Sequence, residues 1–185
     1  MTRNPLIVPA ALAATAALVL GLTGPADAAT ARVTDPDDTA HGSDLLAVRI
    51  VNGENRLLVV TTHQNLRRSP SSGSSGTLYV DTDADDKGPE FVFVGGYFQG
   101  TDYVLLHTEG FGHKKWGDPV EGTYSMKLDY RHEKVRMRMS KDALDGAESV
   151  RIADRVAGTR SDGTSTGLVD WLGEPRSFTD WVDEG

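Results

Sequence analysis

The sequence contains no cysteine, so disulfide bonds are excluded. The fold must therefore be stabilised by a hydrophobic core, by a bound ion, or by both. Basic residues are also few, with 19 Lys and Arg against 27 Asp and Glu, which gives a net charge of −8. No basic stripe is evident in the sequence, and an acidic chain repels phosphate backbones. These absences argue against nucleic acid as a partner.

The first 28 residues have the features of a cleaved secretory signal peptide. Basic Arg3 precedes an apolar stretch from Leu6 to Leu22, and the later Ala-Asp-Ala at 26–28 puts small residues at the positions that signal peptidase reads. We expect cleavage after Ala28, with Ala31 as the alternative. A retained membrane anchor is the other interpretation, although the stretch is short for a hydrocarbon core of about 30 Å. The sequence thus predicts a secreted, extracellular protein, free of the membrane after cleavage, with one domain at 29–185.

Alternating polar and apolar residues predict β-strands through most of this domain. The clearest hairpin pairs residues 44–51 with 56–63, because the turn between them carries Gly53. The apolar run at 91–97 predicts a strand buried on both faces or at a sheet centre. Ser177 would cap a short C-terminal helix. With about eight strands and no βαβ alternation, we predict an all-β fold, an antiparallel β-sandwich of jelly-roll type with a short C-terminal helix.

An acidic loop follows the predicted strand at 77–80. Asp81, Asp83 and Asp85 have the alternate spacing by which carboxylates converge on calcium, an ion that prefers six to eight hard oxygens. Asp86 and Glu90 lie just beyond. An EF-hand is excluded because Asp86 occupies the position that requires glycine. The alternative is a solvated turn, since aspartate bonds nearby backbone N–H groups and keeps sheet ends soluble.

A second acidic run carries Asp35, Asp37, Asp38 and Asp44. Loops at one end of a sandwich can meet, and so many carboxylates would repel one another unless a cation or open water screened them. We therefore predict a structural calcium ion that bridges the two runs. Its expected ligands are Asp81, Asp83 and Asp85, followed by Asp38, Asp86 and Glu90.

The stretch TDPDDTAHGSDLLAVRIVNGENRLLVVTTHQNL at 34–66 resembles the opening of carbohydrate-binding-module family 9-like sandwiches, including the C-terminal domain of glucodextranase-type proteins. LYVDTDADDKGPEF at 78–91 is similar to the strand and acidic loop that follow there. The matching positions are Asp35, Pro36, Asp38, Asp44 and Leu45. The resemblance implies a β-sandwich with a calcium ion near these acids. The long Gly/Tyr/Pro-rich spacer of the glucodextranase form is absent here, so the resemblance does not extend to the ligand site of that form. The chain also resembles small secreted actinobacterial proteins of unassigned role.

Catalytic motifs are weak. GTSTG at 163–167 matches a nucleophile elbow around Ser165, but that motif requires a strand-to-helix turn in an α/β fold. The five histidines form no metal-binding pair, and His63 and His107 are expected to be packing or rim residues. Trp116 is the best candidate for an exposed sugar-binding platform, the alternative being a core aromatic whose polar end reaches the surface.

The sequence therefore predicts a secreted, monomeric, non-enzymatic module that binds a polysaccharide or cell-wall ligand, stabilised by structural calcium. Two alternatives remain. An extracellular protein-interaction or inhibitor domain would show an apolar patch on one sheet face. A small secreted hydrolase would show a histidine or an acid pair in a cleft, with a raised carboxyl pKa.

Overall fold

The computed structural model describes residues 28–39, 43–158 and 168–185, and strands dominate these ranges. Single 3-10 turns lie at Pro70–Ser72, His113–Lys115 and Asp142–Leu144. The strands are β1 (Ala29–Thr34), β2 (Leu45–Gly53), β3 (Arg56–His63), β4 (Ser75–Asp81), β5 (Phe91–Gly96), β6 (Tyr103–Thr108), β7 (Trp116–Pro119), β8 (Tyr124–Asp129), β9 (Lys134–Ser140), β10 (Ser149–Gly158), β11 (Leu168–Trp171) and β12 (Val182–Asp183).

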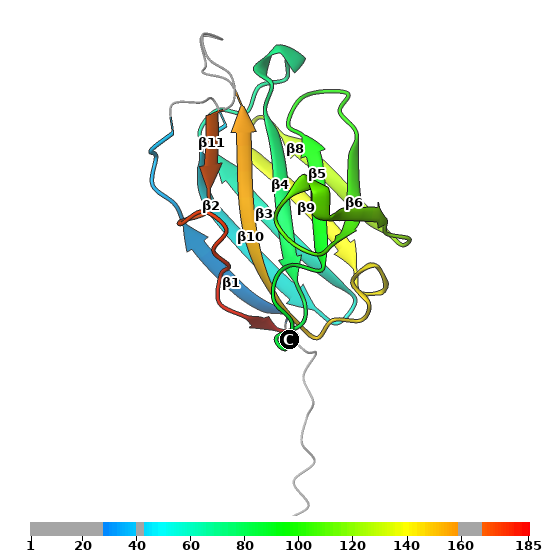
Figure 1. Ribbon diagram of the computed structural model, residues 1–185. Coiled ribbons are helices and arrows are strands. Elements are labelled where there is room, and N and C mark those ends of the chain that lie inside the picture. Colours follow the sequence, from blue (N-terminus) through cyan, green and yellow to red (C-terminus); the bar gives the residue numbers. More distant parts are fainter. Residues whose placement is uncertain (1–27, 40–42, 159–167) are drawn as a thin grey trace, which may run out of the picture.

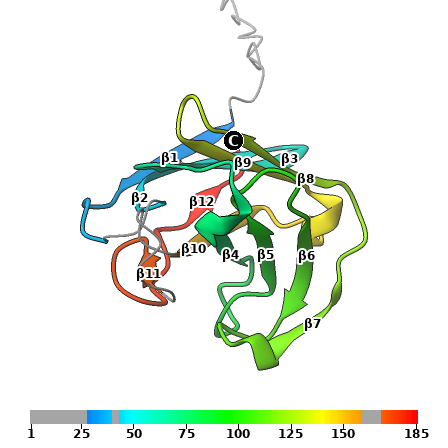
Figure 2. The same ribbon diagram turned by 90° about the horizontal axis from the view of Figure 1, so that it is seen from above.

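The strands form two antiparallel sheets that pack face to face, as Figures 1 and 2 show. The first sheet has the order β1-β2-β3-β9-β8. The second has the order β11-β10-β4-β5-β6-β7, with β12 also paired to β10. The predicted all-β antiparallel sandwich is confirmed. Since β3 neighbours β9 and β4 neighbours β10, segments distant in sequence lie side by side in both sheets.

Alternation along each strand decides which residues enter the core. In β9, Val135, Met137 and Met139 are at most 1 % exposed, whereas Arg136 and Arg138 between them point outward. The predicted hairpin forms β2 and β3, with Gly53 paired to Arg56 at the turn. The core between the sheets is closed by inward residues of the second sheet, chiefly Leu78, Val80, Phe91, Phe93, Leu105, Val150, Ile152 and Val156.

The centre of the second sheet is buried on both faces. Phe91 and Phe93 face the core, while Val92 between them belongs to a second apolar cluster on the outer face with Tyr79 and Ala153. Partly buried side chains cover this outer cluster. They are Val94, Leu106, Phe111, Trp116, Trp171 and Phe178. The prediction that the apolar run at 91–97 lies at a sheet centre is confirmed.

The predicted short C-terminal helix is wrong. Residues 177–181 form no helix or strand, and the Thr179 N–H donates a 2.8 Å hydrogen bond to the Ile152 carbonyl of β10. Further on, β12 pairs with Ser149 and Val150 at the start of β10. The backbone groups of this segment thus complete the edge of the second sheet. A helix would have left that edge of β10 unpaired.

The alternation pattern did not predict β1, whose inward residues are small. Ala29, Ala31 and Val33 pack against the core, and the strand pairs with β2 from Ala29 opposite Asn52 to Thr34 opposite Ala47. Within the three described ranges, no helix is long and apolar enough to cross a membrane.

Gly76 should not tolerate a side chain. A Cβ atom there would overlap the hydroxyl group of Tyr97, a ring that is only 1 % exposed. Gly76 is paired to Val156 and to Gly95, so its backbone cannot move away. We expect Gly76→Ala to lower the free energy of unfolding by about 1–3 kcal/mol, measured by urea denaturation. Gly112→Ala is the control, since a methyl group at that position would have no neighbour within 4 Å. Equal stability of the two variants would contradict this account of the packing.

Candidate metal centre

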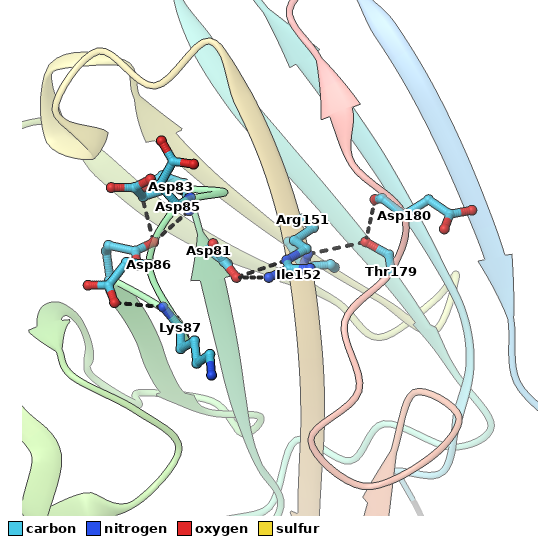
Figure 3. A network of polar contacts seen from close by, with 11 residues as sticks. Asp81, Asp83, Asp85, Asp86, Lys87, Arg151, Ile152, Thr179 and Asp180 are labelled. Atoms are coloured by element: carbon cyan, nitrogen blue, oxygen red, sulfur yellow. Dashed lines mark hydrogen bonds and ion pairs between the residues drawn. The ribbon is translucent and has the colours of Figure 1, made fainter.

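Asp81, the first acid of the predicted calcium loop, is used in an ion pair. It ends β4 and is completely buried. Its Oδ2 accepts a 2.8 Å hydrogen bond from Nε of Arg151 and lies 2.7 Å from Nη2 of the same side chain (Figure 3). The Arg151 guanidinium also stacks over the rings of Phe178 and Trp181, at 4.7 and 4.6 Å. Burial raises the pKa of the Asp81 carboxyl, although the hydrogen bond and the charge of Arg151 oppose that rise.

The other acids of this loop bond their own backbone. Asp83 accepts from the Asp85 N–H at 2.9 Å, and Asp86 accepts from the Lys87 N–H at 2.6 Å (Figure 3). All three aspartates at 83, 85 and 86 are exposed. Glu90 accepts from the Thr82 N–H at 2.6 Å and from its hydroxyl at 3.1 Å. These contacts are those of a solvated turn with short-range side-chain bonds.

The two acidic runs lie at different positions along β10. Asp81 is opposite Arg151, whereas Asp170 of β11, which joins the N-terminal run, is opposite Val156. Five residues of strand correspond to about 17 Å. The expected convergence of Asp38 with the loop at 81–90 is therefore not observed.

The N-terminal run instead meets a distant segment of the chain. Oxygens of Asp35, Asp38 and Asp170 all lie within 4.8 Å of one another, an arrangement that could hold a metal ion. Two of these carboxylates are oriented by the backbone. Asp35 accepts from the Gly173 N–H at 2.7 Å, and Asp170 accepts from the Leu45 N–H at 2.7 Å.

Asp44 adds a fourth carboxylate beside the group. It is completely buried, and its Oδ1 accepts from the Thr39 N–H at 2.9 Å. Its Oδ2 is buried and has no hydrogen-bond partner among the residues that the structure describes. A buried carboxylate oxygen left unpaired is costly, and a cation would satisfy it. We call Asp35, Asp38, Asp44 and Asp170 the N-terminal acid cluster.

The electrostatics of the cluster agree with this proximity. Burial, together with the negative charges of Asp37, Asp38 and Asp35, raises the pKa of Asp44 to about 6, and the hydrogen bond from the Thr39 N–H limits that rise. Burial likewise raises the pKa of Asp170 to about 6, with repulsion from Asp44 and Asp35 contributing. Mutual repulsion at short range favours the protonated forms unless a positive charge is present. The cluster is thus a set of hard oxygen ligands of the kind that calcium prefers.

Sequence reasoning missed the most important member of the cluster. Asp170 lies in a short strand 126 positions after Asp44, and nothing local marks it as a ligand. Only the hydrogen bond from Leu45 and the pairing of β11 with β10 bring it to the acidic run. Asp35 and Asp44 belong to the run that the sequence shows, but their geometry makes them stronger candidates than the loop at 81–90.

A second buried carboxylate lies inside the sandwich. Asp154 occupies an inward position of β10 and is completely buried. Its Oδ1 accepts from the Arg155 N–H, and its Oδ2 has no partner in the described parts of the chain. Burial raises its pKa to about 7, and the charge of Asp170 adds to that shift. The side chain of Tyr97 is also fully enclosed. Burial is the main cause that raises the pKa of its hydroxyl well above the usual value, and the negative charge of Asp154 adds to the rise.

His63 belongs to the same polar region of the core, as expected for a packing residue. Its Nδ1 donates to the Ser43 carbonyl at 3.0 Å, and its Nε2 accepts from the Thr61 hydroxyl at 2.6 Å. The ring also packs edge-on against Tyr97, with centroids 5.1 Å apart. His107, by contrast, is exposed and lies against Phe91. The motif around Ser165, and His41, lie outside the described residues.

Trp116 does not stand alone at the surface. It begins β7, is half-buried against the outer cluster around Tyr79, and stacks on the ring of His113 with centroids 4.1 Å apart. Tyr79 packs against Phe111 at 4.7 Å and Trp171 at 6.2 Å, and its hydroxyl donates to the Phe111 carbonyl at 2.7 Å. The result is a partly exposed aromatic surface on the outer face of the second sheet, which we call the aromatic face.

Asp154 should make stability depend on pH. Its folded pKa of about 7 lies above that of an unfolded aspartate, so the folded state retains a proton that the unfolded state releases between about pH 4 and pH 7. Stability contributed by this group is therefore lost as pH rises through that window. The free energy of unfolding would be measured by urea denaturation in the presence of a chelator. Between pH 5 and pH 7, we expect this free energy to fall by about 2–3 kcal/mol less in Asp154→Asn than in the wild type.

The control for this measurement is Asp102→Asn, which removes one exposed carboxylate elsewhere. It should follow the wild-type pH dependence. If Asp154→Asn also followed the wild-type curve, the account of a buried, protonated Asp154 would be wrong.

No family model matches the chain, and no curated protein matches it at a significant level. The functional argument therefore rests on the geometry described above.

Proposed function

We propose that this protein is an exported, non-enzymatic, monomeric β-sandwich module that binds calcium at the N-terminal acid cluster and a polysaccharide on the aromatic face. The single observation that carries the metal site is the meeting of Asp35, Asp38 and Asp170 within 4.8 Å beside the unpaired Oδ2 of Asp44. In a chain without cysteine, an ion that joins the segment after β1 to β11 would do what a disulfide does in other exported domains.

The position of β1 supports cleavage of the signal peptide after Ala28. Ala29 is the first residue of β1 and pairs with Asn52, so cleavage there would leave the whole strand in the sheet. Cleavage after Ala31 would remove half of β1 and shorten the segment that leads to Asp35. Export would also expose the protein to calcium concentrations suited to weaker extracellular sites.

The aromatic face supports a carbohydrate ligand. Trp116, Trp171, Phe111 and Phe178 are partly exposed on one side of one sheet. Figure 2 shows that the second sheet curves, so that β7 and β11 turn toward this side. Aromatic rings that keep one surface open to water offer large apolar area at low conformational cost.

Two features favour this proposal over its alternatives. The carboxyls whose pKa values are raised to about 6 or 7, Asp44, Asp154 and Asp170, are buried in the interior rather than placed among the aromatic rings, so they serve stability better than catalysis. In the described ranges, the exposed large hydrophobic residues are Tyr103 on β6 and Val169 on β11. Such isolated residues do not form the apolar patch expected of a protein-interaction domain.

Calcium should raise the melting temperature of the mature protein. An ion that binds only the folded state adds about 2.7 kcal/mol at a hundredfold excess over its dissociation constant, which corresponds to about 5–10 °C for a domain of this size. We expect this shift in differential scanning calorimetry, relative to protein in chelator. Asp38→Asn, which changes an exposed ligand, and Asp170→Asn should both abolish it.

Asp83→Asn is the matched control, because it removes an exposed aspartate from the loop after β4. It should keep the full calcium shift. A shift lost in Asp83→Asn but kept in Asp38→Asn would place the ion in the other loop, and no shift in the wild type would refute the metal site.

Polysaccharide binding should depend on Trp116. We expect the protein to co-sediment with at least one neutral insoluble polysaccharide among cellulose, amylose gel and xylan, and Trp116→Ala to weaken that binding by about tenfold. The control is Tyr103→Ala, which removes an exposed aromatic ring that packs on Phe93 and does not belong to the aromatic face. This variant should bind the polysaccharide as well as the wild type. Equal losses in both variants, or no binding by the wild type, would contradict the proposed ligand site.

A further inference from the structure

The outer face of the first sheet carries a row of cations that the linear sequence conceals. The register places Arg32 beside Arg49, Arg49 beside Val60, Val60 beside Arg136 and Arg136 beside Lys127. One residue comes from each of the five strands in sheet order, and four of the five are basic. Four steps between adjacent strands span about 19 Å.

These side chains point away from the core. Their neighbours along each strand, such as Ile50, Val59 and Val135, are completely buried between the sheets, and alternate residues of a strand face opposite sides. Arg32, Arg49 and Lys127 are exposed, and Arg136 is half-buried. Three further cations occupy outward positions of the same sheet, namely Arg56 on β3 and Lys134 and Arg138 on β9.

This face has little negative charge to balance it. One acid, Asp129, occupies an outward position of the five strands, and it is held by His132 at 2.9 Å and Arg136 at 3.0 Å. In the described part of the chain, no ion pair is found for Arg32, Arg49 or Lys127. Like charges directly opposite one another on adjacent strands destabilise a sheet, as Arg32 and Arg49 must here.

The concentration of positive charge contrasts with the rest of the molecule. The whole chain has a net charge of −8, yet seven cations and one acid share this face. A protein that only needed a soluble sheet surface would mix the two signs. The guanidinium groups of Arg32 and Arg49, which have no carboxylate partner in the described part of the chain, instead suit an external anion, because their planar donors match carboxylate or phosphate oxygens.

From this row we infer that the outer face of the first sheet is a second binding surface, whose ligand is a linear acidic polysaccharide lying across the strands along Arg32, Arg49, Arg136 and Lys127. The inference does not depend on the aromatic face, which lies on the other sheet. It also differs from the expectation drawn from composition, since the basic stripe exists only when the strands are paired.

The chemistry of the surrounding positions favours a sugar polymer over other polyanions. Hydroxyl side chains flank the row on the same face, from Thr30, Thr34, Thr62 and Ser125, and they can bond sugar hydroxyls. The larger outward apolar residues are Val51, Leu58 and Val60, which are half-buried. No large aromatic residue stands among the outward positions of these five strands to insert into a lipid leaflet.

The test measures binding of the protein to polygalacturonate, a linear polymer with a carboxylate on each sugar, at low and at physiological salt. We expect binding that weakens as salt rises. Arg32→Gln/Arg49→Gln should lower the affinity by at least about tenfold, since each cation near an anionic surface contributes substantially. Both arginines are exposed, so the double variant should fold, which circular dichroism and thermal unfolding would verify.

Lys87→Gln/Lys114→Gln is the matched control, because it removes the same charge from exposed positions outside the first sheet. It should keep its affinity within about twofold. An equal loss in the two double variants would show a net-charge effect and overturn the inference, as would no binding by the wild type.

Parallel arms use neutral dextran, phosphatidylglycerol vesicles and single-stranded DNA. Binding to vesicles or to DNA that is tighter than binding to polygalacturonate would assign the face to another class of partner and refute the polysaccharide. Trp116→Ala separates the two proposals. It should retain polygalacturonate binding, and if it did not, the acidic polymer would belong to the aromatic face and the basic row would not be its site.

Discussion

Cross-strand register decides which side chains meet in this protein. It sets Asp81 opposite Arg151, places Asp170 of β11 opposite Val156 of β10, and aligns Arg32, Arg49, Arg136 and Lys127 across the other sheet. Because side chains alternate with a period of two, a slip of one residue in any pairing would move charges into the core and apolar residues into water. Each functional surface proposed for the molecule therefore depends on the same hydrogen-bonded ladders that hold the fold.

Burial of carboxylates is the second constraint on the molecule. Asp44, Asp154 and Asp170 lie at the interior with raised pKa values, while Asp81 is buried beside a single guanidinium. Buried charges are costly unless they are paired, protonated or bound to a cation. Asp81 is paired with Arg151, and the raised pKa of Asp154 favours its protonated form. Binding of calcium by the N-terminal acid cluster would supply the third solution, in a chain that has no disulfide to join its ends.

The two outer faces of the sandwich differ in chemistry because they cover different sheets. The second sheet is buried on both sides at its centre and carries aromatic rings outside, whereas the first sheet shows cations, hydroxyls and a few aliphatic residues. A polymer could therefore be held by ring stacking on one side and by charge on the other. The aromatic face also contributes to stability, since Phe178 and Trp181 stack on the arginine that neutralises Asp81.

The sequence by itself determined the fold class, the β2–β3 hairpin and the central position of the strand around Phe91, since these follow from local alternation, turn residues and apolar runs. It also marked the acidic run that holds Asp35, Asp38 and Asp44. Only the tertiary structure decided that Asp170, and not the loop at 81–90, completes that group, and that the C-terminal segment runs as an edge strand instead of a helix. The same holds for the row of cations. The reason is that strand order and register are non-local. A single amino-acid sequence shows where polar and apolar residues alternate, but it does not show which strands will lie beside one another.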